Sequence, residues 1–203
     1  MFWRAFLISI IFVSSFGVFG FQKTSFIEQE DNLVHEIGKR NWVDSVTNTL
    51  TLEEKIGQFF MAAVYTNKDN AHKQEIYSLV KNNKIGGLIF FKGHPTKQAK
   101  WVNDYQYAST IPLMISIDGE WGINMRLDST IRYPRQLTLG AIQDNQLIYK
   151  MGKRIAEECK VVGVNINLAP VVDVNNNPEN PVINDRSFGE NKHNVALKGL
   201  AYM

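Results

Sequence analysis

The chain has 203 residues, of which 44% are hydrophobic and 21% are charged. This balance is typical of a globular protein, and the length suits one domain of roughly 150–200 residues or a piece of a larger one. A net charge of +2 without any cluster of Lys and Arg argues against a nucleic-acid-binding surface. The single cysteine, Cys159, excludes an internal disulfide framework and a cysteine-rich zinc site.

The first twenty residues have the pattern of a secretory signal peptide. Arg4 supplies a positive charge, residues 5–13 form an apolar core, and residues 18–20 form a suitable cleavage site. The apolar core is shorter than a transmembrane helix, and no cysteine follows it that could carry a lipid. We therefore expect an exported protein, periplasmic or secreted, without a stable membrane anchor. An uncleaved anchor is the alternative, and residues 21–40 are expected to be a polar leader.

Helical and strand-like patterns alternate from residue 41 onward. Four short apolar runs predict core strands, at 59–65, 88–91, 113–117 and 164–168. Amphipathic spacing predicts helices over 41–50, 74–82, 96–109 and the stretch that begins at an Asp144 cap. Gly86-Gly87 is expected to supply the left-handed stop before the second strand, and Gly163 the stop before the fourth.

This alternation predicts an α/β fold with a parallel sheet and helices outside it. Four such strands form either a small open sheet or half of an eight-stranded, TIM-type (β/α)₈ barrel. Each strand ends in a loop marked by Gly, Asp or Pro, which favours the barrel. No glycine-rich fingerprint follows the first strand, so a dinucleotide-binding fold has little support.

The loop after the fourth strand is dense in Pro, Asn and Asp and contains Arg186. A guanidinium is a permanent cation with a fixed fork of donors, suited to paired hydroxyls or a carboxylate. Arg186 could therefore bind a ligand, or it could pair with Asp173 or Asp185 and only tie the loop down. Spacing alone leaves both interpretations open.

The stretch Ser116–Gly122, SIDGEWG, places Asp118 where the third strand ends. Barrel enzymes direct side chains at their ligands from this position. Trp121 offers a flat apolar face that could stack on a sugar ring. Alternatively, the stretch is a glycine-rich turn in which Asp118 accepts backbone N–H bonds and Trp121 packs against a neighbouring loop.

Neither a metal nor a cofactor is expected. Asp173-x-Asn175-x-Asn177 imitates the start of a calcium loop, but Pro178 and Asn184 stand where that loop requires Gly and Glu. The histidines lack the spacing of metal ligands, and only one, which follows the second strand, could line a pocket mouth. They are His35, His72, His94 and His193, and the pocket candidate is His94.

Five blocks of the sequence together resemble the N-terminal (β/α)₈ domain of glycoside hydrolase family 3. They are TLEEKIGQ (51–58), KIGGLIFF (84–91), SIDGEWG (116–122), YPRQLTLGA (133–141) and NLAPVVDVNNNPENPVINDRSFGEN (167–191). The resemblance is closer to the short β-N-acetylhexosaminidase branch than to the β-glucosidase branch. It implies that residues 41–203 form roughly the first half of a catalytic barrel that acts on a carbohydrate.

The resemblance also implies roles for individual residues. In this family an aspartate at the position of Asp118 binds substrate hydroxyls, and an arginine at the position of Arg186 contacts the sugar in the −1 pocket. Possible further pocket residues are Glu120, Trp121, Arg126 and Asp173. The hexosaminidase branch usually has Asp-Gln-Glu-Gly-Gly-Arg in the third-strand loop. Here Ile123 takes the place of that arginine, while Arg126 matches a later one.

Family chemistry is retaining hydrolysis, with an aspartate nucleophile and an acid/base that resembles a histidine–aspartate pair in the hexosaminidase branch. No residue up to Met203 can be assigned either role, so both are expected beyond it. The sequence thus predicts part of an exported β-N-acetylhexosaminidase, and this part alone is expected to be inactive. The alternatives are a β-glucosidase of the same family and an inactive, truncated sugar-binding remnant.

The signal pattern predicts cleavage just before Phe21. N-terminal sequencing of the mature protein should therefore begin near this residue. Recovery of the protein with Met1 intact from a soluble cytoplasmic fraction would count against export.

Overall fold

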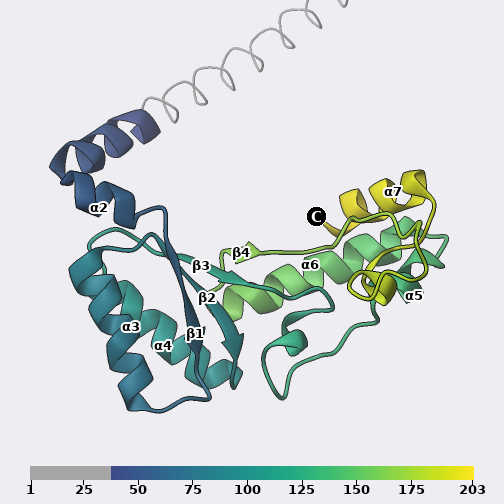
Figure 1. Ribbon diagram of the computed structural model, residues 1–203, viewed down its shortest axis with the longest axis horizontal. Helices are drawn as coiled ribbons and strands as arrows, with labels where there is room; N and C mark the ends of the chain where they lie inside the picture. Colours follow the sequence, from purple (N-terminus) through teal and green to yellow (C-terminus); the bar gives the residue numbers. More distant parts are fainter. Residues whose placement is uncertain (1–37) are drawn as a thin grey trace, which may run out of the picture. The chain divides into compact units, whose positions relative to one another are not determined.

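The computed structural model describes residues 38–203, and Figure 1 draws the chain. The predicted signal peptide (1–20) and the leader up to residue 37 lie outside the described residues. The chain divides into two compact units, Met1–Thr51 and Leu52–Met203. In the first unit residues 38–49 form a helix, which confirms the helical pattern predicted over 41–50.

The second unit is built from alternating helices and strands in the predicted order. Its elements are α2 (Leu52–Gly57), β1 (Met61–Tyr65), α3 (Asn70–Asn83), β2 (Gly87–Lys92), α4 (Pro95–Ala108), β3 (Met114–Ile117), η1 (Ile123–Met125), α5 (Gln136–Gly140), α6 (Asn145–Val161), β4 (Ile166–Asn167), η2 (Asn184–Arg186) and α7 (Lys192–Tyr202). The α/β class is therefore confirmed.

All four strands pair in parallel, in the order β1-β2-β3-β4. The ladder to β4 is longer than the strand itself, because Asn165 N–H donates to Ile115 O and Leu168 N–H to Ile117 O, each at 2.8 Å. Sequential parallel pairing places every carboxyl end on one edge of the sheet. The loops that follow β3 and β4 therefore leave from neighbouring points.

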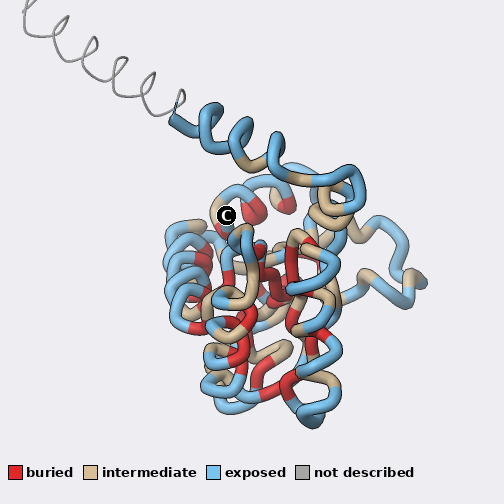
Figure 2. The backbone as a smooth tube through the Cα atoms, turned by 90° about the vertical axis from the view of Figure 1, so that its left-hand side faces the viewer, coloured by how far each residue is buried: buried red, intermediate tan, exposed pale blue. Residues whose placement is uncertain are grey.

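One face of the sheet is covered by helices. The register aligns Val64, Phe90 and Ile117 in one row and Leu88 with Ile115 in the next, and each of these side chains is at most 1% exposed. In Figure 1, α3 and α4 lie side by side along β1 and β2. Figure 2 shows the buried residues gathered along the strands and the inner sides of these helices.

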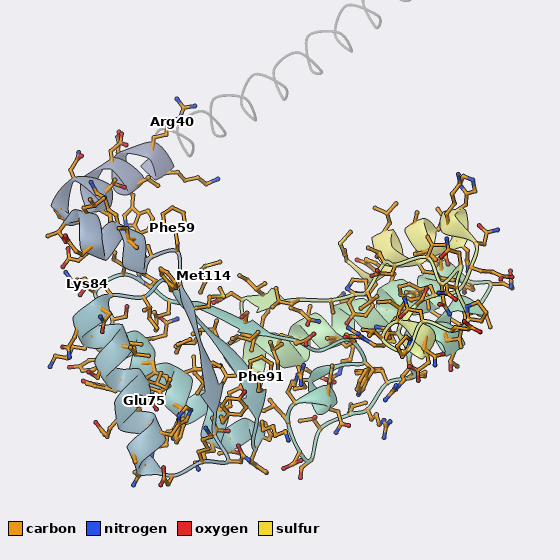
Figure 3. All side chains as sticks on the ribbon, in the orientation of Figure 1. Arg40, Phe59, Glu75, Lys84, Phe91 and Met114 are labelled. Atoms are coloured by element: carbon orange, nitrogen blue, oxygen red, sulfur yellow. The ribbon has the colours of Figure 1, made fainter. Side chains whose placement is uncertain are left out.

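The opposite face of the sheet is only partly covered. Met61 and Met114 alternate with the buried row and are 44% and 48% exposed. Figure 3 labels Met114 at the amino end of β3 and Phe91 near the carboxyl end of β2. In a closed barrel this face would point into the interior, where layers of side chains from the other strands fill the space.

Helix capping agrees with the sequence patterns. Asp144 caps α6 as predicted, accepting the Gln146 N–H at 2.9 Å, and Gly163 follows that helix with φ 76°. Helix α3 begins four residues before the predicted start because Asp69 caps it, accepting the His72 N–H at 3.2 Å. In the described part of the chain, no helix combines the length and the apolar character needed to cross a membrane.

Two local predictions were wrong. The first strand begins at Met61, because Phe59 and Phe60 donate to Ile56 O and Gly57 O in the turn that ends α2. The left-handed residue after α3 is Lys84, with φ 47°, and neither Gly86 nor Gly87 has a positive φ.

Gly86 is needed for close approach instead of for a turn. A Cβ there would lie 1.9 Å from Gln58 O, a backbone atom that cannot move aside easily. The Gly86 N–H also donates to Phe60 O and Gly57 O, at 3.1 Å each. This glycine therefore lets the end of α2 pack directly against the start of β2.

Candidate functional site

Two polar loops meet at the carboxyl edge of the sheet. The first runs from Asp118 to Arg135 after β3, and the second follows β4 and ends before α7. Because β3 and β4 are neighbours, the loops leave the sheet side by side. In parallel α/β proteins this is the edge at which ligands bind.

Asp118 is the first residue after β3 and is held by Arg126. The Arg126 Nε–H donates to Asp118 O at 3.0 Å, and Arg126 Nη2 donates to Asp118 Oδ2. The Arg126 guanidinium lies 5.0 Å from the Phe91 ring centroid, and Phe91 stacks on Tyr65 at 5.5 Å and 18°. Aromatic side chains from the ends of β1 and β2 thus support the cation that orients Asp118.

Glu120 and Arg186 form the most buried ion pair of the site. Arg186 Nε donates to Glu120 Oε1 and Oε2 at 3.1 and 3.0 Å, and Arg186 Nη2 donates to Oε1 at 2.7 Å. The Glu120 side chain is 1% exposed and that of Arg186 is 32% exposed. The backbone of Glu120 is fixed as well, because Gln136 Nε2 donates to Glu120 O at 2.8 Å.

The electrostatic surroundings of Arg186 favour its charged form. Hydrogen bonds to Glu120 raise the pKa of Arg186 above its ordinary value, although partial burial opposes this. The negative charges of Glu120, Asp118 and Asp173 raise this pKa further. Carboxylates from both loops therefore act on one guanidinium.

Arg186 keeps donors available after these contacts. Glu120 takes the Nε–H and one N–H of Nη2, while Val182 O accepts from Nη1 at 3.2 Å. One N–H on each of Nη1 and Nη2 has no acceptor within residues 38–203. Likewise, Asp118 Oδ1 accepts no hydrogen bond from any described residue, since Arg126 uses Oδ2. The site therefore presents a pair of donors and a carboxylate oxygen that a ligand could use.

A second ion pair links the same loops, with the arginine on the first loop and the carboxylate on the second. Arg135 Nη1 donates to Asp185 Oδ1 and Oδ2 at 2.8 and 2.6 Å. The Arg135 guanidinium also lies 4.4 Å from the Trp121 ring centroid, within the range of a cation–π contact. We call the two pairs, Glu120–Arg186 and Arg135–Asp185, the double clasp, because each loop contributes one arginine and one carboxylate.

Gly119, between the two acidic residues of the first loop, is held by β4 and α7. The Gly119 N–H donates to Asn167 Oδ1 at 3.0 Å, and the Tyr202 hydroxyl donates to Gly119 O at 3.2 Å. The second loop has its own tie, from the Ser187 hydroxyl to Asp173 O. The first loop is thus anchored to β4 and α7, and the second is tied to itself.

The structure brings all six residues singled out by the sequence to one edge of the sheet, but with different partners. Of the two interpretations left open for Arg186, the one that paired it with Asp173 or Asp185 named the wrong partner, because Arg186 forms its ion pair with Glu120. One face of Trp121 is already covered by Arg135. The six residues are Asp118, Glu120, Trp121, Arg126, Asp173 and Arg186, and a role in substrate binding stays a prediction for each of them.

Other residues that the sequence flagged have structural contacts. His94 caps α4, its Nδ1 accepting the Thr96 N–H at 3.3 Å. Asn177 Oδ1 accepts the Glu179 N–H at 3.0 Å, as in a local turn. Among residues 38–203 no group of three or more acidic, His or Cys side chains could hold a metal. Burial raises the pKa of the Cys159 thiol to about 11, so it is protonated at neutral pH.

Four side chains of the site were missed by the sequence reasoning: Arg135, Asn167, Ser187 and Tyr202. Arg135, Asn167 and Ser187 lie inside blocks that carried the family resemblance, which was an available signal. Tyr202 follows an ordinary helical stretch, and its partner Gly119 is 83 positions away. Only the tertiary structure reveals this contact.

A parallel β/α unit that gathers carboxylates and arginines where its strands end has the organisation of a β/α-barrel enzyme. Residues 51–203 match the glycosyl hydrolase family 3 N-terminal domain, and the chain belongs to this family.

Known relatives and solved structures agree with this assignment. Beta-hexosaminidase A of Pseudoalteromonas piscicida is 36% identical over 140 residues, which are 63% of this chain and 23% of that protein. A family 3 beta-N-acetylglucosaminidase from Paenibacillus sp. str. FPU-7 is similar with a TM-score of 0.67 and 35% identity, over 76% of this chain and 30% of that one. The structure of the beta-glucoside phosphorylase BglX bound to 2FGlc is similar with a TM-score of 0.74 and 25% identity. The match covers 80% of this chain and 29% of that one.

The chain spans less than a third of each of these three proteins. The four-stranded sheet is accordingly part of a (β/α)₈ barrel, and the alternative of a small open sheet is not supported.

The difference in burial between the two clasp pairs predicts a difference in stability. Glu120→Gln should lower the free energy of unfolding by about 1–3 kcal/mol, because it removes charge-assisted bonds from a buried acceptor. Asp185→Asn should cost less than about 1 kcal/mol, because that pair is 39% and 44% exposed. Urea unfolding of the full-length protein would measure both losses. The slope of unfolding free energy against urea concentration should stay unchanged. Equal losses would contradict the ranking.

Proposed function

We propose that the chain forms the N-terminal part of an exported glycosidase that removes terminal β-linked N-acetylhexosamine residues with retention of configuration. The observation that carries this proposal is that Arg186 has unused N–H donors and Asp118 an unused Oδ1, while the charge of Asp118 acts on the Arg186 guanidinium. A terminal sugar presents adjacent hydroxyls that can both accept and donate hydrogen bonds. A fixed donor pair next to a carboxylate oxygen matches that pattern.

The pocket suits transition-state binding because its groups are pre-arranged. Glu120 binds Nε and Nη2 of Arg186 and so fixes the plane of the guanidinium. The remaining N–H groups of Arg186 then point away from the Glu120 carboxylate. Arg126 similarly fixes Asp118. Substrate binding then requires little ordering of these side chains, which reduces the entropic cost of gripping the sugar.

The bond-breaking groups lie, in this proposal, in chain that follows Met203. Retaining hydrolysis needs a carboxylate nucleophile that attacks the anomeric carbon while an acid protonates the leaving oxygen. Water activated by the same group then releases the sugar from the glycosyl-enzyme. The residues described here would contribute to holding the sugar during both steps, and none of them is assigned the nucleophile or acid/base role.

Names of relatives support the acetamido sugar. The Pseudoalteromonas piscicida relative is a beta-hexosaminidase, and the similar Paenibacillus structure is a beta-N-acetylglucosaminidase.

A β-glucosidase is the second candidate, and one observation favours it. Ile123, which replaces the arginine usual in the hexosaminidase branch, is 3% exposed and belongs to the hydrophobic core. The described loop therefore lacks one cation of that branch. One of the similar solved structures is, according to its name, a beta-glucoside phosphorylase.

Export is proposed from the first twenty residues alone. Their positive start, apolar core and small-residue cleavage site are the pattern of a secretory signal. A periplasmic or secreted location would place the enzyme where glycans of a cell envelope or of the surroundings are accessible.

Arg186→Ala and Asp118→Ala in the full-length enzyme should each lower kcat/KM, corresponding to a cost of about 1.5–3 kcal/mol in transition-state binding. Each substitution removes charge-assisted hydrogen bonds to sugar hydroxyls. Aryl N-acetylglucosaminide and aryl glucoside would be compared in parallel, and the preferred substrate decides between the two branches. Wild-type efficiency in both variants would rule out the assigned roles.

Residues 21–203 expressed alone should aggregate or remain loosely packed, and should hydrolyse no aryl glycoside. Four strands leave two open edges, and the face bearing Met61 and Met114 lacks its covering layers. Thermal unfolding followed by circular dichroism tests the stability. Release of the aryl group from an aryl glycoside, compared with a buffer control, tests turnover. A sharp cooperative transition would refute the first expectation. Measurable turnover would refute the second and would mean that catalytic residues lie before Met203.

A further inference from the structure

The charged side chains of the site differ widely in how far they are exposed to solvent. The side chains are 1% exposed for Glu120, 19% for Arg126, 28% for Asp118, 32% for Arg186, 39% for Arg135 and 44% for Asp185. The Arg135–Asp185 pair is therefore the most exposed charged pair of the site, and we call it the rim. In a glycosidase that removes terminal sugars, the terminal sugar occupies the inner end of the pocket. The leaving group then lies at the rim.

The rim arginine is fixed, yet most of its donors are unused. Asp185 binds Arg135 only through Nη1, and Trp121 supports one face of the guanidinium. The Nε–H and both N–H groups of Nη2 have no acceptor in the described part of the chain. These groups make up the side-on edge of the guanidinium, the edge that Arg186 uses to bind Glu120.

We propose that the free side-on edge of Arg135 is a binding site for a carboxylate on the leaving-group side of the substrate. A planar donor pair of this kind matches two carboxylate oxygens in a bidentate pair. Support by Trp121 holds the plane in place, so little side-chain entropy is lost on binding. This inference rests on the proposed glycosidase function and extends it to the class of leaving group.

Asp185 opposes an incoming anion while it holds Arg135. Its carboxylate contacts the same guanidinium, so a second carboxylate on the side-on edge is repelled by the first. The proposal therefore predicts opposite effects for two neighbouring substitutions. Arg135→Gln should abolish the preference for an anionic leaving group, whereas Asp185→Asn should increase it.

The test uses the full-length enzyme and two aryl glycosides of the same sugar, with 4-carboxyphenyl and 4-carbamoylphenyl leaving groups. The measured quantity is the ratio of kcat/KM for the carboxylate to that for the amide. Arg135→Gln should lower this ratio by about five- to tenfold, and Asp185→Asn should raise it. Arg132→Gln is the matched control, because Arg132 is exposed on the same segment and loses the same charge. Its ratio should equal that of the wild type.

Added salt should lower the wild-type ratio and leave that of Arg135→Gln nearly constant. An unchanged ratio in Arg135→Gln, or an equal loss on both substrates, would overturn the carboxylate site and leave Arg135 as a structural residue. Those outcomes keep the glycosidase proposal intact. A wild-type enzyme that hydrolyses neither glycoside nor any other would overturn both proposals.

Discussion

The bidentate pair between Glu120 and Arg186 is the interaction on which the rest of the site depends. Glu120 is almost fully buried, so its charge must be compensated within the protein. Arg186 provides this compensation from a loop 66 residues further along the chain. The pair consequently fixes the distance between the two loops. It also determines which edge of the guanidinium is left for a ligand.

The other contacts of the site extend this constraint in both directions. Toward the sheet, Gln136 holds the backbone of Glu120, and Asn167 holds the preceding Gly119. Arg135 and Asp185 form a second, more exposed pair between the same loops, in which the first loop supplies the arginine and the second the carboxylate. Removing one partner of the buried pair should cost more stability than removing one partner of the exposed pair, because it leaves an uncompensated buried charge. The outer pair uses only Nη1 of Arg135 and leaves its other N–H donors without an acceptor among residues 38–203.

The fold could be predicted from the sequence because its signals are local. Apolar runs such as Leu88–Phe91 identified the strands, and Asp144 identified the start of α6 through the donors of a single helical turn. The wrong details came from tertiary contacts. Gly86 appeared to be a helix stop, but the close approach of Gln58 explains it. Arg186 had two nearby acidic candidates, and a distant buried glutamate bound it instead. Spacing along a chain carries no information on such partners.

The hydroxyl of Tyr202 has a consequence for the order in which the protein assembles. It closes a contact with Gly119 across 83 positions, and its own neighbour in the site, Asn167, belongs to the last strand of the sheet. During synthesis the acidic loop after β3 leaves the ribosome long before either partner does. Domains form their long-range contacts only once the necessary chain is available. The acidic loop after β3 therefore reaches its final conformation late, after the first three strands can already have paired, because it needs the contact from the end of α7.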